Sequence, residues 1–328
     1  MNYILPFQEK EFEKGVKKIL ESGLMKTNYY TKKLEKEFAK QFNYKYAIAM
    51  PSGTDSITAT IIILNSFARC YRVLVPSLTV KEIYQAMTMS GVRTYFMDIS
   101  RELPVPGQEE ITKAIIKHNA DAVFYVHTAG LSKLHEIDLP DDIILIEDCS
   151  HAHGIKELGH RGLVSIYSFF TTKVLGGGVG IIATDNKELY RLILKFVRHD
   201  RNSPVMGYPY DVPELHALIA YLDTKYWKKL VKIRQEQAEI YHNVSISSLQ
   251  DKMTYEPTYY KFTVTEKPPE GMKLTGFTHK PPLFPTKNSV FWANNHWNLY
   301  IGRTYEDLDI VKKNAEVLRN EKIYAPSL

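Results

Sequence analysis

The sequence predicts an α/β protein in which a largely parallel sheet has helices on both faces, followed by a smaller α+β region. Short apolar runs alternate with stretches whose apolar residues recur at helical spacing. Short buried strands that alternate with helices form mostly parallel sheets with both faces covered. After about Asn202 the alternation stops, and a segment rich in Pro and Tyr leads into a long helical stretch. This change of pattern predicts a second, smaller unit.

Seven short apolar runs are the expected strands of the sheet. They span residues 46–50, 72–75, 94–97, 122–126, 143–147, 165–169 and 179–184. Helices are expected before the first run and between most of the others. The clearest helical faces consist of Phe12, Val16, Ile19 and Leu20, of Tyr30, Leu34 and Phe38, and of Ile57, Ile61 and Leu64.

The last third of the chain has a different pattern. A helical stretch rich in Lys, Glu and Leu is expected from about Pro213 to His242. An alternating segment near 259–265, Pro-rich loops near 280–285 and an amphipathic helix near 305–318 follow it. We therefore predict a large domain over residues 1–205, and a connecting helix with a small C-terminal domain over residues 206–328.

The composition argues against several classes of protein. Of 328 residues, 44% are hydrophobic and 24% charged, which is typical of a globular protein in water. No run approaches the ~18 apolar residues of a membrane helix, so no membrane partner is expected. Two cysteines, Cys70 and Cys149, form neither a disulfide framework nor a metal-site spacing, which favours a cytoplasmic location. The net charge of +5 is scattered among acidic residues, so no nucleic-acid partner is expected.

Three polar features follow predicted strands, where an open α/β sheet binds its ligands. The first is the Ser-Gly-Thr sequence at 52–54, between a strand and the start of a helix. Backbone N–H groups and the positive end of a helix dipole suit a phosphate there, and Gly53 permits close approach. Taken alone, this turn is more simply explained as a helix cap of small residues.

The second feature is Asp148, which ends an apolar run. A buried charge is costly unless it is paired, so this carboxylate is either functional or part of a helix cap or an internal salt bridge. Two histidines follow it, His151 and His153, and their spacing of two could suggest a metal. Because no further Cys, His or carboxylate ligands stand at a fitting spacing, no metal site is predicted.

The third feature is Lys173, which follows another apolar run and precedes the glycines at 176–178. A lone Lys in a loop is usually a solvated charge. Between an aromatic strand end and a glycine-rich turn, however, partial burial would free its amine as a nucleophile.

Together these features resemble the DegT/StrS-type sugar aminotransferases, a branch of the fold-type I pyridoxal-phosphate enzymes. The resemblance extends from about residue 8 to residue 200 and rests on the order and spacing of many short segments. The segments are 34–39, 46–49, 52–54, 75–77, 96–98, 126–130, 147–148, 151–154, 168–169 and Lys173. It implies an aspartate-aminotransferase-like large domain that binds pyridoxal phosphate, with a smaller α+β domain after it.

The resemblance implies that two residues are catalytic. Lys173 would hold pyridoxal phosphate as a Schiff base, and Asp148 would pair with its protonated pyridine nitrogen. That pairing lets the ring accept electrons from the carbanion formed during amino transfer. The freed amine of Lys173 would then shuttle a proton.

The resemblance also implies how the cofactor is held. His151 would lie beside the ring, and Gly53, Thr54 and Ser168 would hold the phosphate. No metal takes part.

Several positions depart from the pattern of the family. Val80 stands where many members have an aromatic residue that stacks on the ring. Val174 follows the lysine where Asn is usual. Pro209 stands where an Asn commonly reaches the phosphate in the neighbouring subunit. These departures leave the cofactor chemistry in place and put the sugar substrate in question.

The resemblance implies a homodimeric aminotransferase that moves an amino group, from an amino-acid donor such as glutamate, onto a keto-sugar linked to a nucleotide. Two alternatives stay open: a related enzyme with the same cofactor and a different carbonyl or amine substrate, and a catalytically silent paralogue that serves as a binding or scaffold subunit. A sugar dehydratase is disfavoured, because such members replace the lysine. Candidates to bind the carboxylate of the donor are Arg198, Arg201 and Arg303.

Overall fold

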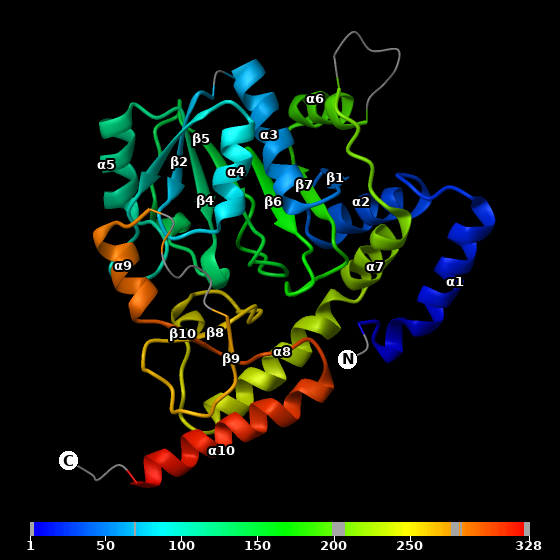
Figure 1. Cartoon of the computed structure of the whole chain (residues 1–328). Coiled ribbons are helices and arrows are strands. Elements are labelled where there is room, and N and C mark those ends of the chain that lie inside the picture. Colours follow the sequence, from blue (N-terminus) through cyan, green and yellow to red (C-terminus); the bar gives the residue numbers. More distant parts are fainter. Residues whose placement is uncertain (1–2, 69, 199–206, 277–281, 283, 325–328) are drawn as a thin grey trace.

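A seven-stranded sheet forms the centre of the first two thirds of the chain (Figure 1). The computed structural model describes residues 3–68, 70–198, 207–276, 282 and 284–324. The strand order is β1-β7-β6-β5-β4-β2-β3. The strands are β1 (Tyr46–Met50), β2 (Arg72–Pro76), β3 (Arg93–Met97), β4 (Ala122–Val126), β5 (Ile144–Asp148), β6 (Val164–Ser168) and β7 (Gly180–Thr184). Strand β7 runs antiparallel to both neighbours, and the other pairs are parallel.

The seven predicted strands coincide with β1 to β7, and their ends differ by at most one residue. The predicted mostly parallel sheet is therefore confirmed. Antiparallel β7 has a local cause, because the loop after β6 turns back at the glycines 176–178 rather than crossing the sheet through a helix.

Helices cover both faces of this sheet. One face carries α3 (Gly53–Ala68), α4 (Lys81–Met89) and α6 (Lys187–Val197), and the other carries α2 (Tyr29–Gln41), α5 (Gln108–His118) and α7 (Glu214–Lys225). Alternate side chains of β1 show why both faces are buried. Ala47 and Ala49 pack in the core with α2, whereas Ile48 and Met50 pack in the core with α3.

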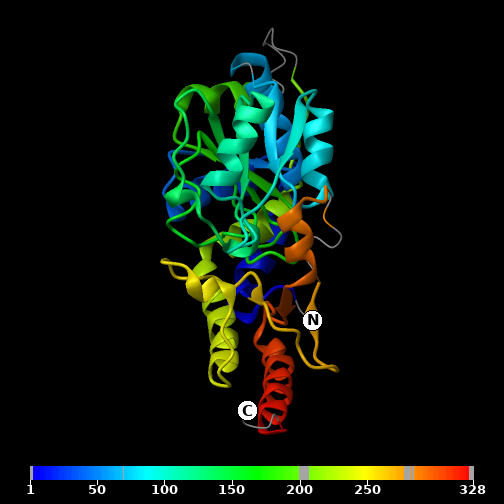
Figure 2. The ribbon, with the colours of Figure 1, turned by 90° about the vertical axis from the view of Figure 1, so that its left-hand side faces the viewer.

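The last part of the chain forms a smaller unit beside the carboxyl ends of the strands (Figures 1 and 2). Its sheet has the order β8-β10-β9, formed by β8 (Phe262–Val264), β9 (Leu274–Thr275) and β10 (Trp297–Leu299). Helices α8 (Trp227–His242) and α10 (Leu308–Tyr324) pack on it through Tyr241, Phe262 and Val311. The predicted domain boundary at residues 205 and 206 lies outside the described residues.

The single helical stretch predicted from Pro213 to His242 is instead two helices. Helix α7 ends at Lys225 and α8 begins at Trp227, with Tyr226 between them at φ −105° and ψ 17°. Contacts to α1 (Pro6–Ser22) explain the break, because the Tyr226 hydroxyl donates to Glu11 and its ring packs edge-on against Phe7, at 5.3 Å between centroids. These partners are distant in sequence, so local periodicity does not reveal them.

The remaining elements connect the two units or shape loops. They are α9 (Lys287–Asn294), η1 (Thr128–Gly130), η2 (Leu134–Glu136), η3 (Leu249–Lys252) and η4 (Tyr305–Asp307), where η marks a 3-10 turn. Within the described part of the chain, no helix has the length and apolar character needed to cross a membrane.

Candidate active site

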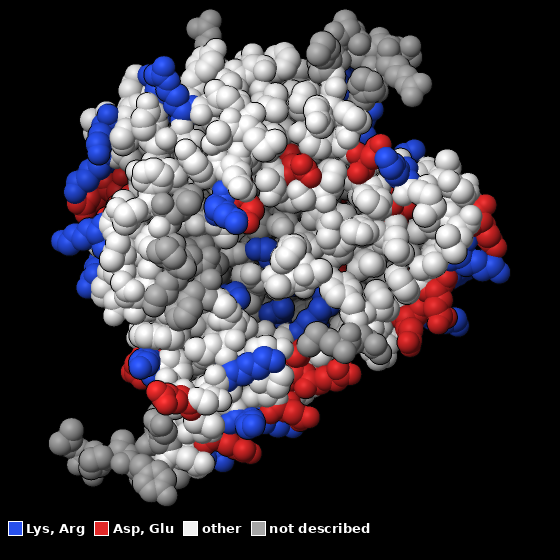
Figure 3. Space-filling model, in the orientation of Figure 1, with Lys and Arg blue, Asp and Glu red and all other residues white. Residues whose placement is uncertain are grey.

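A cavity of about 440 Å³ lies at the carboxyl ends of β5 and β6. The six site residues predicted from the sequence all line it. They are Gly53, Thr54, Asp148, His151, Ser168 and Lys173. Figure 3 shows the molecule hollowed between the large sheet and the smaller unit, with Lys and Arg atoms inside the hollow. The topology therefore brings together residues that lie up to 120 positions apart in the chain.

The turn between β1 and α3 forms one side of the cavity. Ser52 caps the helix, because its Oγ accepts a hydrogen bond from the Asp55 N–H at 3.0 Å. A Cβ at Gly53 would lie 2.7 Å from the Cβ of Ser168, so only glycine allows α3 to begin this close to the end of β6. The helix N-terminus and two hydroxyls, of Thr54 and Ser168, therefore converge on a space that suits a phosphate.

Asp148 is the last residue of β5 and is only 6% exposed. Its Oδ1 accepts a hydrogen bond from the Ser150 N–H at 2.9 Å. Among the described residues, no Lys, Arg or His side chain lies within ion-pair distance of it. A buried carboxylate that faces a cavity without a cationic partner fits a ligand that brings its own positive charge, such as a protonated ring nitrogen.

Lys173 lies in the loop that joins β6 to β7. Its own N–H donates to the Phe170 carbonyl at 2.8 Å, and Gly178 N–H donates to the Phe169 carbonyl, also at 2.8 Å. Gly177 and Gly178 have φ of +131° and +76°, a conformation that favours glycine. The Lys173 amine has no carboxylate within ion-pair distance in the described part of the chain, so it is available to a ligand.

His151 is positioned by a strained loop after β4. The Ala129 N–H donates to His151 Nδ1 at 3.0 Å, although Ala129 has a left-handed φ of +56°, which is costly for a residue with a Cβ. Two side chains of the smaller unit hold this loop. Gln250 donates to the Ala129 carbonyl at 3.1 Å, and the Tyr255 hydroxyl donates to the Gly130 carbonyl at 2.8 Å.

Residues of the smaller unit that the sequence did not predict lie beside the lining residues His151 and Lys173; Tyr260, Lys261 and Arg234 are called the wall below. The Tyr260 ring stacks on His151 at 4.3 Å between centroids, and the Lys173 Nζ lies 4.9 Å from the Tyr260 centroid. The Lys261 Nζ lies 5.0 Å from the same centroid. Burial raises the pKa of Tyr260, but the charges of Lys173, Lys261 and Arg234 outweigh it, so this pKa falls below its usual value. No local motif marks these residues.

His153 is fully buried beside this wall. Neither of its ring nitrogens has a hydrogen-bond partner among the described residues. Burial lowers its pKa to about 3, and the charges of Lys173 and Arg234 act in the same direction. The ring is therefore neutral at physiological pH, and its neighbourhood carries excess positive charge.

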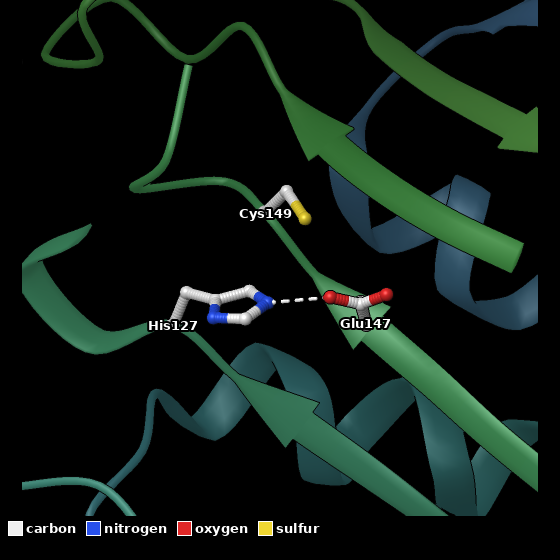
Figure 4. A group of neighbouring side chains, drawn as sticks. All are labelled: His127, Glu147 and Cys149. Atoms are coloured by element: carbon white, nitrogen blue, oxygen red, sulfur yellow. Dashed lines mark hydrogen bonds and ion pairs between the residues drawn. The ribbon is translucent and has the colours of Figure 1, made fainter. Parts of the chain in front are cut away.

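A second polar group, His127 and Glu147 with Cys149 beside them, lies at the ends of β4 and β5 (Figure 4). His127 Nε2 and Glu147 Oε2 are 2.9 Å apart. Backbone N–H groups in the loop 159–162 also donate to the Glu147 carboxylate, at 2.6 to 3.0 Å. Burial raises the pKa of Glu147, but these hydrogen bonds outweigh it and lower the pKa. Because they engage both carboxylate oxygens, we interpret this group as a structural network.

Of the three arginines proposed from the sequence, the two that the structure describes do not line the cavity. Arg198 pairs with Glu35 at 2.5 Å, and Arg303 pairs with Asp223 at 2.6 Å. Arg201 lies outside the described residues. Neither described arginine is thus free to serve as the main partner of a substrate carboxylate.

The three departures from the family pattern lie in different environments. Val80 lines the cavity as the N-cap of α4. Val174 is buried in the core beneath the Lys173 loop, and Pro209 is exposed. Of the three, Val80 is therefore the one that faces the ligand space in this chain.

This topology, with a lysine and a buried carboxylate at the strand ends, defines the class of fold-type I pyridoxal-phosphate enzymes. The chain belongs to the DegT/DnrJ/EryC1/StrS aminotransferase family, whose model matches residues 6–259. The protein is thus a pyridoxal-phosphate-dependent aminotransferase, as the sequence predicted.

Several known proteins are similar to this chain. GDP-perosamine synthase from Escherichia coli O157:H7 is 27% identical over 271 residues, which are 76% of this chain and 73% of the relative. E. coli GDP-4-keto-6-deoxy-D-mannose-3-dehydratase, solved with bound hydrated PLP, is 21% identical with a TM-score of 0.81, over 94% of this chain and 96% of that one. The Helicobacter pylori aminotransferase PseC, involved in the biosynthesis of pseudoaminic acid, is 15% identical with a TM-score of 0.78, over 95% and 96%. The two structural similarities concern the fold.

Proposed function

We propose that this protein transfers an amino group from an amino-acid donor to a keto-sugar linked to a nucleotide, with Lys173 and Asp148 as its catalytic residues. The observation that carries the proposal is the cavity in which an amine and a buried carboxylate, both without an ion-pair partner among the described residues, lie beside a helix N-terminus suited to phosphate. The name of the relative GDP-perosamine synthase supports a nucleotide-linked substrate.

In this proposal, the cofactor binds to the part of the cavity lined by Gly53, Thr54, Asp148, Ser168 and Lys173, which we call the floor. Gly53, Thr54 and Ser168 would hold its phosphate, because they surround the start of α3. Asp148 would hold a proton on its ring nitrogen. Pyridoxal phosphate, when bound, supplies an electron sink for the pair released when the Cα–H bond of the donor breaks.

The remaining work is proton transfer and positioning. Lys173 Nζ accepts the proton from Cα as a general base and returns a proton later as a general acid. The loop anchored between β6 and β7 keeps this amine at the cavity throughout. His151, fixed by the Ala129 N–H, would stand beside the ring and limit its movement.

The proposal includes a homodimer in the cytoplasm. The dimer follows from the family resemblance, in which active sites lie at the subunit interface. Cys70 and Cys149 are both buried and unbridged, which suits a reducing compartment. Light scattering coupled to size-exclusion chromatography measures the assembly directly, and a monomeric mass would contradict the dimer.

The central test is to locate the lysine that holds the cofactor. Borohydride reduction of the cofactor-loaded protein should fix a pyridoxyl group on the peptide that contains Lys173. Lys173→Ala should abolish this label and reduce amino transfer by on the order of 10⁴-fold. Lys156→Ala, at an exposed position, is the matched control and should keep both. Labelling of another lysine, with Lys173 unmodified, would overturn the assignment.

A substrate assay separates amino transfer from the dehydration named for one structural neighbour. Incubation of a nucleotide-linked keto-sugar with glutamate should yield an amino sugar and 2-oxoglutarate in equal amounts. A sugar product that has lost water and gained no nitrogen would contradict the proposal.

A further inference from the structure

Two cations beside Tyr260, the buried Arg234 and the half-buried Lys261, lack a carboxylate partner among the described residues. Arg234, on α8, is only 3% exposed, and its Nη1 donates to the carbonyls of Tyr259 and Tyr260 at 3.2 and 3.4 Å. Lys261 follows Tyr260 directly and is half-buried. Among the described residues, no carboxylate lies within ion-pair distance of either side chain. Burial of unpaired charge is costly, so this arrangement calls for an anion.

Asp307, the carboxylate that acts on Arg234, and Asp223, the partner of the neighbouring Arg303, are already engaged. The Asp223 carboxylate pairs with Arg303. The Asp307 carboxylate accepts hydrogen bonds from the Tyr300 hydroxyl at 2.6 Å and from Thr304 at 2.8 and 2.9 Å. These carboxylates therefore reduce the positive charge of Arg234 and Lys261 only from a distance, and the positive charge near Tyr260 is not neutralised.

The unpaired cations adjoin the reacting amine. Amines of Lys173 and Lys261 lie 4.9 and 5.0 Å from the centroid of the Tyr260 ring. Arg234 fixes the backbone of Tyr260 and so positions both the ring and Lys261. Burial, with Arg234 and Lys173 nearby, lowers the pKa of Lys261, although Tyr260 acts in the opposite direction. An anion bound here would relieve this repulsion.

We propose that Lys261 and Arg234, beside Tyr260, form an anion subsite of the active site that receives a carboxylate or phosphate group of a substrate. The inference rests on the proposed function only in taking Lys173 as the reacting amine. Two sources carry this chemistry: the carboxylate of a dicarboxylic amino donor and the diphosphate of a nucleotide-linked sugar. Lys261 supplies the direct contact, and Arg234 supplies charge and positions the backbone.

Calorimetric titration of the cofactor-loaded protein with two unreactive anions tests this subsite. Glutarate represents the dicarboxylic donor, and GDP represents the nucleotide. Lys261→Met should weaken one of them by about 10- to 100-fold, because a hydrogen bond to a charged group is lost. Lys261→Arg should restore most of the affinity. Lys232→Met, on the exposed side of α8, removes the same charge and should change neither affinity.

The outcomes are distinct. Loss of glutarate binding alone assigns the subsite to the amino donor, and loss of GDP binding alone assigns it to the nucleotide. Unchanged affinity for both anions in Lys261→Met would overturn the subsite. Arg234→Lys keeps the charge and shortens the reach, so it should weaken the same anion as Lys261→Met; an opposite selectivity would contradict a shared site. Because these titrations involve no turnover, they are independent of the Lys173 labelling that tests the proposed function.

Discussion

The floor and the wall of the active-site cavity are built in different ways. On the floor, polar residues follow the strands of a mostly parallel sheet, so Asp148 and Ser168 lie where their strands end. On the wall, Arg234 comes from the middle of a helix, and Lys261 precedes a three-residue strand. The topology of the sheet fixes the floor, whereas the wall depends on how the smaller unit packs.

The family model covers the floor and one residue of the wall, Arg234. Its match ends at residue 259, just before Tyr260 and Lys261. We interpret the floor as the part that carries the chemistry of the family, and Tyr260 and Lys261 of the wall as residues that select the substrate of this chain. The following predictions test this division.

The largest effect is expected on the floor. Asp148→Asn keeps the shape of the side chain and removes the charge that, in the proposed function, holds the ring nitrogen protonated. We expect the cofactor to stay bound, while the half-reaction with the amino donor slows by on the order of 10²–10³-fold. Single-turnover absorbance measurements follow this step. Asp142→Asn, exposed just before β5, should behave like the wild type. A near-normal rate in Asp148→Asn would mean that this carboxylate is structural.

An intermediate effect is expected at Val80, at the edge of the floor. Val80 replaces a stacking aromatic residue, and Pro209 replaces an Asn that donates a hydrogen bond to the phosphate. Loss of both contacts would weaken cofactor binding by roughly 30- to 2000-fold relative to a typical member of the family. We therefore expect the protein to lose cofactor on dialysis. Val80→Trp should tighten binding by about 2- to 12-fold, and Val80→Leu, which adds size without an aromatic ring, should not. Full occupancy after prolonged dialysis, with no gain from tryptophan, would show that another group has replaced the contact.

The smallest effect is expected at the wall and concerns ionisation. Because the pKa of Tyr260 is lowered, its tyrosinate should form earlier in an alkaline titration than that of Tyr255, whose pKa burial raises. Ultraviolet absorbance measures the change. Tyr260→Phe should remove an early step, and Tyr255→Phe should not. Lys261→Met should move the Tyr260 step to higher pH, and an unmoved step would mean that the cations of the wall do not act on this ring.

The same shift has a consequence for stability, and its sign can be stated. A folded-state pKa below the unfolded value adds stability that is present above the unfolded pKa, about 10, and is lost as pH falls through the folded value. Tyr260→Phe should therefore lower the free energy of unfolding only in alkaline solution. A pH-independent loss would indicate a packing defect instead.

The residues of the floor could be predicted from the sequence for a physical reason. A buried strand is an uninterrupted apolar run, and the polar residue that ends it marks the sheet edge, so Gly53, Asp148 and Lys173 could be placed together. The local sequence pattern did not predict the break at Tyr226, because that break is caused by contacts with α1. It did not predict the wall either, because the wall forms only when α8 packs beside β8. Arg198 and Arg303 were proposed as ligands for a carboxylate, but each has an internal acidic partner that spacing does not reveal.

The antiparallel strand β7 has a kinetic consequence. Because the loop that contains Lys173 is pinned at both ends by β6 and β7, its amine has an effective concentration at the cavity on the order of millimolar or higher. In the proposed function, a free amine in solution must compete with this tethered amine for the carbon of pyridoxal phosphate that forms the Schiff base. An amine that reaches the site only by diffusion therefore competes poorly with Lys173. An amine that first binds the protein through a separate anionic group gains an effective concentration of its own. With Lys173 in the proposed role, we therefore expect the enzyme to select against amines that have no anionic group to bind through.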